Sequence, residues 1–358
     1  MFDFTSALYL GLTHSTESLD SWNALSLGKP AVLQEPPGAE RVAAQLARLQ
    51  GCESAILLPS TLHAFWDLFQ VLGREPIAII RDAGLYAIGR WGTERAAALG
   101  IPVHVCSHHD ADRMARLAWR MSRAQLRPVI VTDGFCPACG RVAPLRAHAE
   151  IAARYGGYLV IDDTQALGIL GDSPRPGCPY GEGGGGSLRW HQAFGPHILV
   201  ASSLAKGFGA PVAVLAGSRE LIDRFRRESE TRLHCSPPSL AVIHAAHRAL
   251  LWNRSHGEAL RTRLTQLVIR LREHMSSAGF SPMGTLPFPV QSFFPRHRSD
   301  VALVYQRLLR CGITALLANA CRALTAMLTF IVTTRNRIPQ IDYVGRMAAR
   351  ANTLMEAS

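Results

Sequence analysis

The sequence has almost no lysine. Among its 38 lysine and arginine residues only Lys29 and Lys206 are lysines, so arginine supplies nearly all of the basic charge behind the formal net charge of +11. Lys206 lies between two apolar segments, 198–201 and 211–216, that read as buried strands. A buried ammonium must be paired or neutralised, and arginine cannot replace an amine that forms a Schiff base. Lys206 is therefore a candidate catalytic residue, with a lysine that extends its charged end into solvent as the structural alternative.

The sequence also lacks the features of membrane, secreted and zinc-binding proteins. No apolar run reaches about 18 residues, so we expect no membrane span. The opening MFDFTSALYLGLTHS has neither a basic start nor a cleavage site, so we expect no secretory signal and a cytoplasmic protein. The eight cysteines should then be reduced. Cys136 and Cys139 form a C-x-x-C pair, but no second pair has suitable spacing, so we expect no metal site.

Basic runs interleaved with aromatic side chains are missing as well, which argues against nucleic acid as a partner. The arginine excess favours an anionic partner, such as a phosphate, a nucleotide or a thioester of coenzyme A. An arginine-biased genome would give the same composition on an ordinary soluble surface. The charge therefore suggests a class of co-substrate without identifying one.

Alternating strand and helix patterns between about residues 50 and 220 predict an α/β fold with a mostly parallel central sheet flanked by helices. The length of 358 residues and the hydrophobic content of 48% suit one large domain with a smaller one appended. We expect an N-terminal arm over 1–37, a large domain over 38–250 and a small C-terminal α/β domain over 251–358. The expected strands are 55–58, 77–80, 103–106, 129–132, 158–161, 198–201 and 211–216, and the expected helices include 38–51, 62–72, 110–125, 220–232, 238–252 and about 256–278.

Residues 172–197 form an unusual glycine-rich loop with four consecutive glycines at 183–186. Such a run has no side chains to pack and loses much entropy on folding, so it cannot be a regular element. A lid over the active site and a disordered surface insertion are both open interpretations of this loop.

Asp162 and Asp163 follow the apolar segment 158–161, at the sheet edge where open α/β folds bind ligands. This strand and its D-D-x-x-x-x-G motif, together with the following strand and the S-x-x-K-x-x-G motif of 203–209, resemble fold-type I pyridoxal-phosphate enzymes. The sequence is most similar to the α-oxoamine synthases, which include 8-amino-7-oxononanoate synthase, glycine C-acetyltransferase and serine palmitoyltransferase. The resemblance covers most of the chain, from TSALYLGL to IDYVGRM.

The resemblance implies pyridoxal 5′-phosphate as the cofactor, with Lys206 as its Schiff-base lysine. Asp162 would keep the pyridine nitrogen protonated, because a neighbouring anion raises the pKa of that nitrogen. Tyr86 occupies the position of a histidine that stacks on the cofactor ring, and a tyrosine supplies a similar π face. Gln165 replaces a histidine that contacts the cofactor hydroxyl, and it can still form a hydrogen bond.

The phosphate is expected at the start of the helix predicted from residue 62, where the strand–turn–helix junction presents free N–H groups. The turn is Ser60-Thr61-Leu62, whereas the family usually has Ser-Gly-aromatic. The backbone of Thr61 and Leu62 and the hydroxyl of Ser203 would bind the phosphate. The resemblance further implies that Ser236 reaches the phosphate of a partner subunit, which makes a homodimer the expected assembly.

Residues that bind substrate in the family are missing. A serine of the family falls on Pro137, a carboxylate-binding asparagine on Ala7, and an Arg-x-Arg pair on Met327-Leu328-Thr329. A bidentate arginine is the natural partner of an α-carboxylate. Arg322 and Arg335 are candidate substitutes.

Three functions remain open at this point. The first is an α-oxoamine synthase-like transferase that forms a carbon–carbon bond between an amino-acid Cα carbanion, generated through a Lys206 aldimine, and an acyl thioester. The second is a divergent enzyme of specialised metabolism that performs transamination, or β- or γ-elimination coupled to carbon–carbon bond formation. The third is an inactive subunit that supports an active paralogue, which the presence of Lys206 disfavours. The expected partners are an amino acid and a second co-substrate, for which the arginine excess favours an anion.

Overall fold

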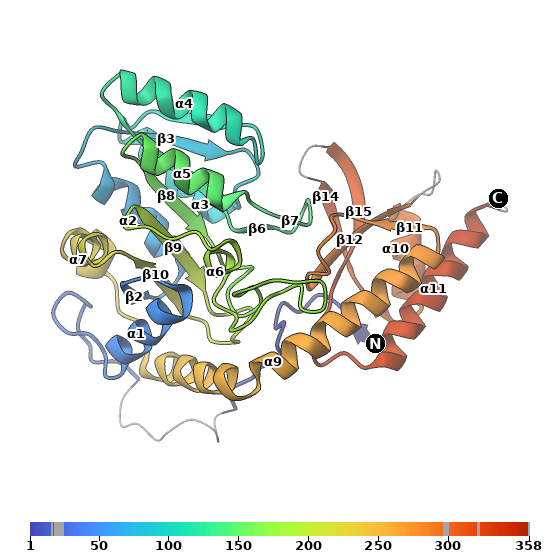
Figure 1. Ribbon diagram of the computed structural model, residues 1–358. Helices are drawn as coiled ribbons and strands as arrows, with labels where there is room; N and C mark the ends of the chain where they lie inside the picture. The colour runs from blue at the N-terminus through green and yellow to red at the C-terminus, as the bar shows by residue number, and fades with distance from the viewer. Residues whose placement is uncertain (16, 18–24, 296–300, 321–322, 357–358) are drawn as a thin grey trace.

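The computed structural model describes residues 1–15, 17, 25–295, 301–320 and 323–356 (Figure 1). Its largest sheet has seven strands in the order β2-β10-β9-β8-β5-β3-β4. β10 runs antiparallel to both of its neighbours and the other pairs are parallel, which confirms the predicted mostly parallel sheet. The strands are β2 (Ser54–Leu58), β3 (Ile77–Asp82), β4 (Val103–Cys106), β5 (Arg127–Asp133), β8 (Tyr158–Asp162), β9 (Ile198–Ser203) and β10 (Ala213–Gly217).

Helices cover both faces of this sheet because successive strand residues point to opposite sides. In β5, Val129 and Val131 pack in the cluster that contains side chains of α2, α3 and α7, whereas Ile130 packs with α4 and α5. A strand buried on both faces needs the continuous apolar sequence that these segments have. The helices are α1 (Ala39–Gln50), α2 (Thr61–Leu72), α3 (Ala87–Ala98), α4 (Ala111–Arg123), α5 (Leu145–Arg154) and α7 (Arg219–Glu228).

The C-terminal part contains a four-stranded sheet in the order β11-β12-β15-β14. Figure 1 shows the long helix α9 (Leu240–Ser277) extending from the large sheet to this smaller one. The predicted domain boundary at residue 250 stays a prediction, and that position lies within α9. The elements are β11 (Phe280–Pro282), β12 (Val290–Pro295), α10 (Val301–Arg310), β13 (Ile313–Thr314), β14 (Leu316–Ala320), β15 (Ala323–Ile331) and α11 (Ile338–Glu356).

The N-terminal arm joins the two parts. β1 (Phe2–Asp3) pairs in parallel with β13 in the C-terminal part. Phe4 is buried in the same core, and its carbonyl accepts a hydrogen bond from the Ile331 N–H at 2.8 Å. Tyr9, five residues on, is also buried. Short elements complete the described chain: β6 (Phe135–Cys136), β7 (Arg141–Val142), α6 (Ser187–His191) and α8 (Glu230–His234).

Two helix boundaries differ from the sequence prediction. The segment 220–232 is divided at Ser229, whose extended backbone ends α7 and begins α8. The segments 238–252 and 256–278 form one continuous helix, α9. Asn253 is a poor helix former, but its side-chain amide donates to the Gly183 carbonyl at 2.9 Å and its Oδ1 accepts from Arg261 at 2.7 Å. The contact with Gly183 and the contact with Arg261 of the same helix outweigh the local preference. Among the described residues, no helix is both long and apolar enough to cross a membrane.

The glycine-rich loop packs against the rest of the protein, so a disordered insertion is the wrong interpretation. Gly184, Gly185 and Gly186 are buried. The Gly183 N–H donates to Glu258 of α9 at 2.7 Å, and the Gly183 carbonyl accepts from the Asn253 amide of α9 at 2.9 Å. A Cβ on Gly185 would lie 2.2 Å from the Leu49 carbonyl oxygen of α1. The glycines therefore allow two backbones to approach closely.

Gly186 leaves space for the carboxylate of Asp163, the residue that follows Asp162. The Asp163 carboxylate is buried, and it accepts hydrogen bonds from the Ser187 N–H at 2.9 Å and from the Ser187 hydroxyl. Burial raises the pKa of Asp163 to about 7. Gly186 has φ +94°, and a Cβ there would lie 2.1 Å from Asp163 Oδ2. This position excludes a side chain on both grounds.

We expect Gly186→Ala to lower the free energy of unfolding by about 1–3 kcal/mol, because it forces a side chain into a left-handed backbone conformation. Urea unfolding followed by circular dichroism measures the change. Gly177→Ala is the matched control in the same loop, since a Cβ at Gly177 would meet no described atom within 4 Å and the φ of Gly177 is not in the left-handed region. Equal stability of the two variants would contradict this role of Gly186.

Candidate active site

A pocket lies at the carboxyl ends of β5, β8 and β9, where open α/β sheets bind ligands. Five of the predicted residues line it, although they come from four separate segments of the chain. The structure also adds residues that the sequence did not single out. The lining residues are Thr61, Tyr86, Asp133, Phe135, Pro137, Asp162, Thr164, Gln165 and Lys206.

Two carboxylates lie side by side in this pocket. The strand register pairs Asp133 at the end of β5 with Asp162 at the end of β8, and both side chains are buried. Burial, followed by the charge of Asp162, raises the pKa of Asp133 well above its usual range. Burial also raises the pKa of Asp162, but hydrogen bonds from Thr164 and the charge of Lys206 oppose this effect. The negative charge of the pair is therefore favoured on Asp162.

Lys206 follows β9 and faces the same acidic pair. Burial lowers the pKa of its amine, and the charges of Asp162 and Asp133 act in the opposite direction. Its Nζ lies 5.9 Å from the centre of the Tyr86 ring. A lysine with a lowered pKa in a pocket is a suitable nucleophile or proton carrier. The alternative of a lysine that only extends into solvent does not fit this environment.

Tyr86 is fixed through its backbone while its ring stays accessible. The Tyr86 N–H donates to the two Asp133 oxygens at 3.0 and 3.2 Å. The side chain is 57% exposed and borders the pocket. The ring therefore offers an open face to a bound planar molecule.

The start of α2 forms one rim of the pocket. Ser60 is the N-cap residue, but its hydroxyl pairs with His63 Nδ1 at 2.9 Å and does not cap the helix. The first N–H groups of the helix, from Thr61 and Leu62, are left for another acceptor. Backbone N–H groups at the start of this 12-residue helix suit an anion.

Gln165 and Thr164 tie the pocket to its surroundings. The buried Tyr9 hydroxyl donates to Gln165 Oε1, so the N-terminal arm orients this amide. The Thr164 N–H donates to Asp162 Oδ1 at 3.0 Å, and Thr164 Oγ1 accepts from the Ser203 N–H at 3.1 Å. The Ser203 hydroxyl itself accepts from the Ala205 N–H at 3.3 Å.

Four predicted cofactor contacts do not line the pocket with their side chains. Ser60 and Leu62 flank the lining residue Thr61 in sequence, and Ser203 lies three residues before Lys206. Ser236 is exposed in the segment between α8 and α9. The predicted role of Ser236 concerns a second subunit and stays a prediction.

The candidate carboxylate-binding arginines differ in what the structure shows. Arg322 lies outside the described residues. Arg335 donates to the Gly11 carbonyl at 3.1 Å and to Thr13 Oγ1 at 2.6 Å, so it holds the N-terminal arm. On β15, Thr329 is buried and its hydroxyl pairs with that of Ser292 at 2.8 Å. The family position of Arg-x-Arg is therefore part of the core here.

Sequence reasoning missed Asp133 and Thr164. Asp133 carried a usable signal, because it ends an apolar strand that was predicted to neighbour others in a parallel sheet. Its pairing with Asp162 depends on strand order, which the sequence does not contain. Thr164 lies within the D-D-x-x motif, and only the fold shows that it links Asp162 to Ser203.

Known proteins with similar sequences cover most of the chain. An 8-amino-7-oxononanoate synthase from Acidithiobacillus ferrooxidans is 28% identical over 320 residues, which is 87% of this chain and 78% of the relative. One from Methylococcus capsulatus is 27% identical over 359 residues, which is 95% of this chain and 86% of the relative.

Solved structures share the fold at lower identity. A serine palmitoyltransferase variant from S. paucimobilis, with a bound pyridoxal phosphate–myriocin aldimine, has a TM-score of 0.84 at 16% identity and covers 99% of this chain and 88% of its own. An 8-amino-7-oxononanoate synthase from Francisella tularensis has a TM-score of 0.73 at 16% identity, covering 99% and 98%. The aminotransferase class I and II family matches residues 34–347. The chain therefore belongs to this family and is a pyridoxal-phosphate-dependent transferase of fold type I.

Proposed function

We propose that the protein is an α-oxoamine synthase-like enzyme that joins an amino-acid carbanion to an acyl thioester and forms a carbon–carbon bond. The observation that carries the proposal is the pocket in which Lys206 faces Asp162 and Asp133. The similarity to two proteins named 8-amino-7-oxononanoate synthase, over 87% and 95% of the chain, supports this reaction class.

The pocket residues fit pyridoxal phosphate. An anion at the buried Asp162 would hold the proton of the pyridine nitrogen. The Tyr86 ring would stack on the cofactor, and the N–H groups of Thr61 and Leu62 would bind its phosphate. Because Tyr9 donates to Gln165 Oε1, the Nε2 amide of Gln165 is the end that can donate to the cofactor hydroxyl.

The chemistry divides between the cofactor and the chain. When bound, pyridoxal phosphate supplies an electron sink for a carbanion at the amino-acid Cα. Lys206 would attach the cofactor through Nζ and then move the Cα proton, since burial lowers its pKa and favours the neutral amine. Burial raises the pKa of Asp162, whereas the hydrogen bonds from Thr164 and the charge of Lys206 favour the anionic form that this role requires.

A cytoplasmic homodimer is part of this proposal. None of the seven described cysteines forms a disulfide, which suits a reducing compartment. Ser236 is exposed, as a residue that contacts the site of a second subunit has to be. The formal charge of +11 suits an anionic thioester as the second substrate.

With two lysines in the chain, the point of cofactor attachment can be mapped cleanly. We expect borohydride reduction of the holoenzyme to place the pyridoxyl group on the Lys206 peptide, as detected by mass spectrometry. Lys206→Ala should lose the visible absorbance of the bound cofactor, because no other pocket residue offers an amine. Lys29→Ala is the matched control and should keep it. Modification of Lys29 alone would refute the assignment.

Replacing Asp162 tests the electrostatic role of the acidic pair. We expect Asp162→Asn to lower kcat by about 10²–10³-fold, because a neutral amide no longer favours a protonated pyridine nitrogen. Asp133→Asn should lose less, since the amide oxygen can still accept from the Tyr86 N–H. Steady-state kinetics and cofactor occupancy are measured together. A larger loss in Asp133→Asn would assign the anionic role to Asp133.

A two-substrate assay separates acyl transfer from the alternatives. The holoenzyme is incubated with a panel of amino acids and acyl-coenzyme A thioesters, and free thiol release is followed with a disulfide reagent. We expect release only when both substrates are present, and none from Lys206→Ala. Formation of a 2-oxo acid without thioester would indicate transamination, and release of a β- or γ-substituent would indicate elimination. Absence of all three activities in the cofactor-loaded enzyme would favour the inactive subunit.

A further inference from the structure

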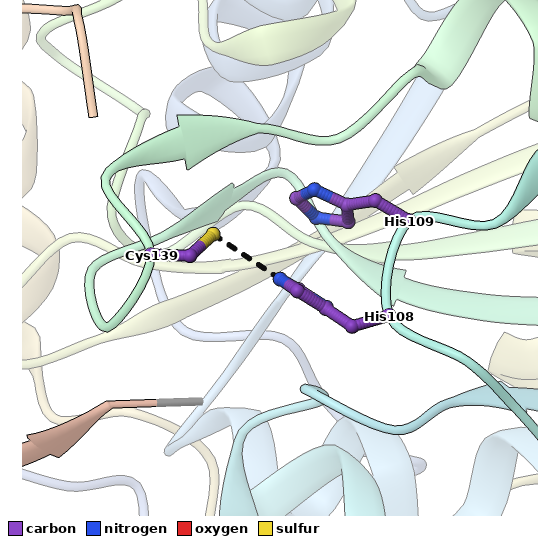
Figure 2. A group of neighbouring side chains, drawn as sticks. All are labelled: His108, His109 and Cys139. Atoms are coloured by element: carbon purple, nitrogen blue, oxygen red, sulfur yellow. Dashed lines mark hydrogen bonds between the residues drawn. The ribbon is translucent and has the colours of Figure 1, made fainter. Parts of the chain in front are cut away.

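Three potential metal ligands meet beside the pocket, on two loops that are far apart in sequence. His108 and His109 follow β4, and Cys139 lies in the turn between β6 and β7 (Figure 2). One nitrogen of each histidine and the Cys139 sulfur lie within 4.8 Å of one another. His108 Nε2 is 3.2 Å from Cys139 Sγ. With Zn–N of about 2.0–2.1 Å and Zn–S of about 2.3 Å in a tetrahedron, ligand atoms lie roughly 3.3–3.7 Å apart, so small side-chain movements suffice.

A buried carboxylate contacts the ring of one histidine and the backbone of the other. Asp82 Oδ1 pairs with His108 Nδ1 at 2.6 Å, which leaves the Nε2 lone pair directed toward Cys139. Asp82 Oδ2 accepts from the His109 N–H at 2.8 Å. Metal-binding histidines commonly have such a carboxylate on the second ring nitrogen, where it fixes the tautomer and strengthens the ligand.

Two further features have no explanation in the cofactor pocket. His109 has φ 57°, a left-handed conformation that is unusual for a residue with a side chain and is concentrated at functional sites. Its Nε2 is buried and has no hydrogen-bond partner within the described part of the chain. At Gly84, a Cβ would lie 2.4 Å from His108 Nδ1, so the glycine makes room for this ring. The placement of the two rings thus requires a strained backbone at His109 and leaves His109 Nε2 without a partner among the described residues.

We propose that His108 Nε2, a ring nitrogen of His109 and Cys139 Sγ bind one Zn²⁺ ion, with water in the fourth position. The nitrogen and sulfur ligand set favours zinc over calcium or magnesium. Cys139 binds as the thiolate, and its proton is released to solvent. The sequence expectation of no metal site considered only pairs of C-x-x-C motifs, and it therefore overlooked histidines supplied by another loop.

The ion would hold the wall of the pocket in place. The β6–β7 hairpin that carries Cys139 also carries Phe135 and Pro137, which line the pocket. Asp82 begins the loop that leads to Tyr86, and it accepts from the Gly84 N–H at 2.6 Å. A metal ion would bind the hairpin through Cys139, and it would bind the loop from Asp82 to Tyr86 through His108, which pairs with Asp82. It would therefore fix the hairpin and this loop relative to each other. The three ligands are positioning residues in this proposal, because none of them lines the pocket described here.

Metal content of the purified full-length protein is the first test. After incubation with Zn²⁺ and removal of unbound metal, we expect one zinc per wild-type chain by elemental analysis. His109→Ala and Cys139→Ser should each weaken zinc binding by about tenfold or more. The matched controls are His104→Ala and Cys311→Ser, which change an exposed histidine and an exposed cysteine elsewhere. The proposed site would be overturned if the wild type held no more zinc than the background. It would also be overturned if both ligand variants held one zinc per chain.

A second measurement avoids any variant that fails to fold. The wild-type protein is alkylated with iodoacetamide with and without Zn²⁺, and modification of each cysteine is mapped by peptide mass spectrometry. Zinc should slow modification of Cys139 and leave that of Cys311 unchanged, because a coordinated thiolate is protected. Equal rates at Cys139 in both conditions would overturn the proposal. Neither readout depends on pyridoxal phosphate or on turnover, so the result is independent of the proposed function.

Discussion

The pairing of two buried carboxylates at neighbouring strand ends is the constraint on which the site depends. Strand register places Asp133 beside Asp162, and two like charges this close cannot both ionise easily in a buried environment. Lys206 and Thr164 favour the charged form of Asp162, whereas Asp133 accepts from the backbone N–H of Tyr86. The negative charge of the pair is therefore favoured on Asp162 over Asp133, next to an amine of lowered pKa, and this arrangement suits chemistry on a bound cation or imine.

The glycine-rich loop contributes to the same strand end from the opposite side. Asp163 is next to Asp162, and its carboxylate accepts from Ser187 at the end of the glycine run. Gly186 must lack a side chain for this contact, and Gly183 of the loop binds Asn253 and Glu258 of α9. None of the loop's described residues lines the pocket. The loop thus acts as a support behind the catalytic edge, and its interpretation as a lid stays a prediction.

The features that could be predicted from the sequence are those carried by short, continuous motifs. Lys206, Asp162 and the helix start at Thr61 each lie in a short motif at a strand end, and strand alternation placed them on one sheet edge. Contacts between distant segments could not be predicted. The order of strands joins Asp133 to Asp162, and the N-terminal arm brings Tyr9 to Gln165. These contacts form only in the assembled fold, and no short motif in the sequence predicts them.

The hairpin of β6 and β7 connects the large sheet, the neighbouring loop and the C-terminal part at one point. Phe135 stacks on Phe288 with ring centres 3.8 Å apart, and a Cβ on Gly140 would lie 2.4 Å from the Met283 carbonyl oxygen. On its other side Cys139 meets His108, which Asp82 holds. Because Phe135 also lines the pocket, a change in how the C-terminal part packs would reach the cofactor site through this hairpin. A cation bound at Cys139 would resist such movement. The hairpin that forms this wall of the pocket would then be more ordered when the metal is bound.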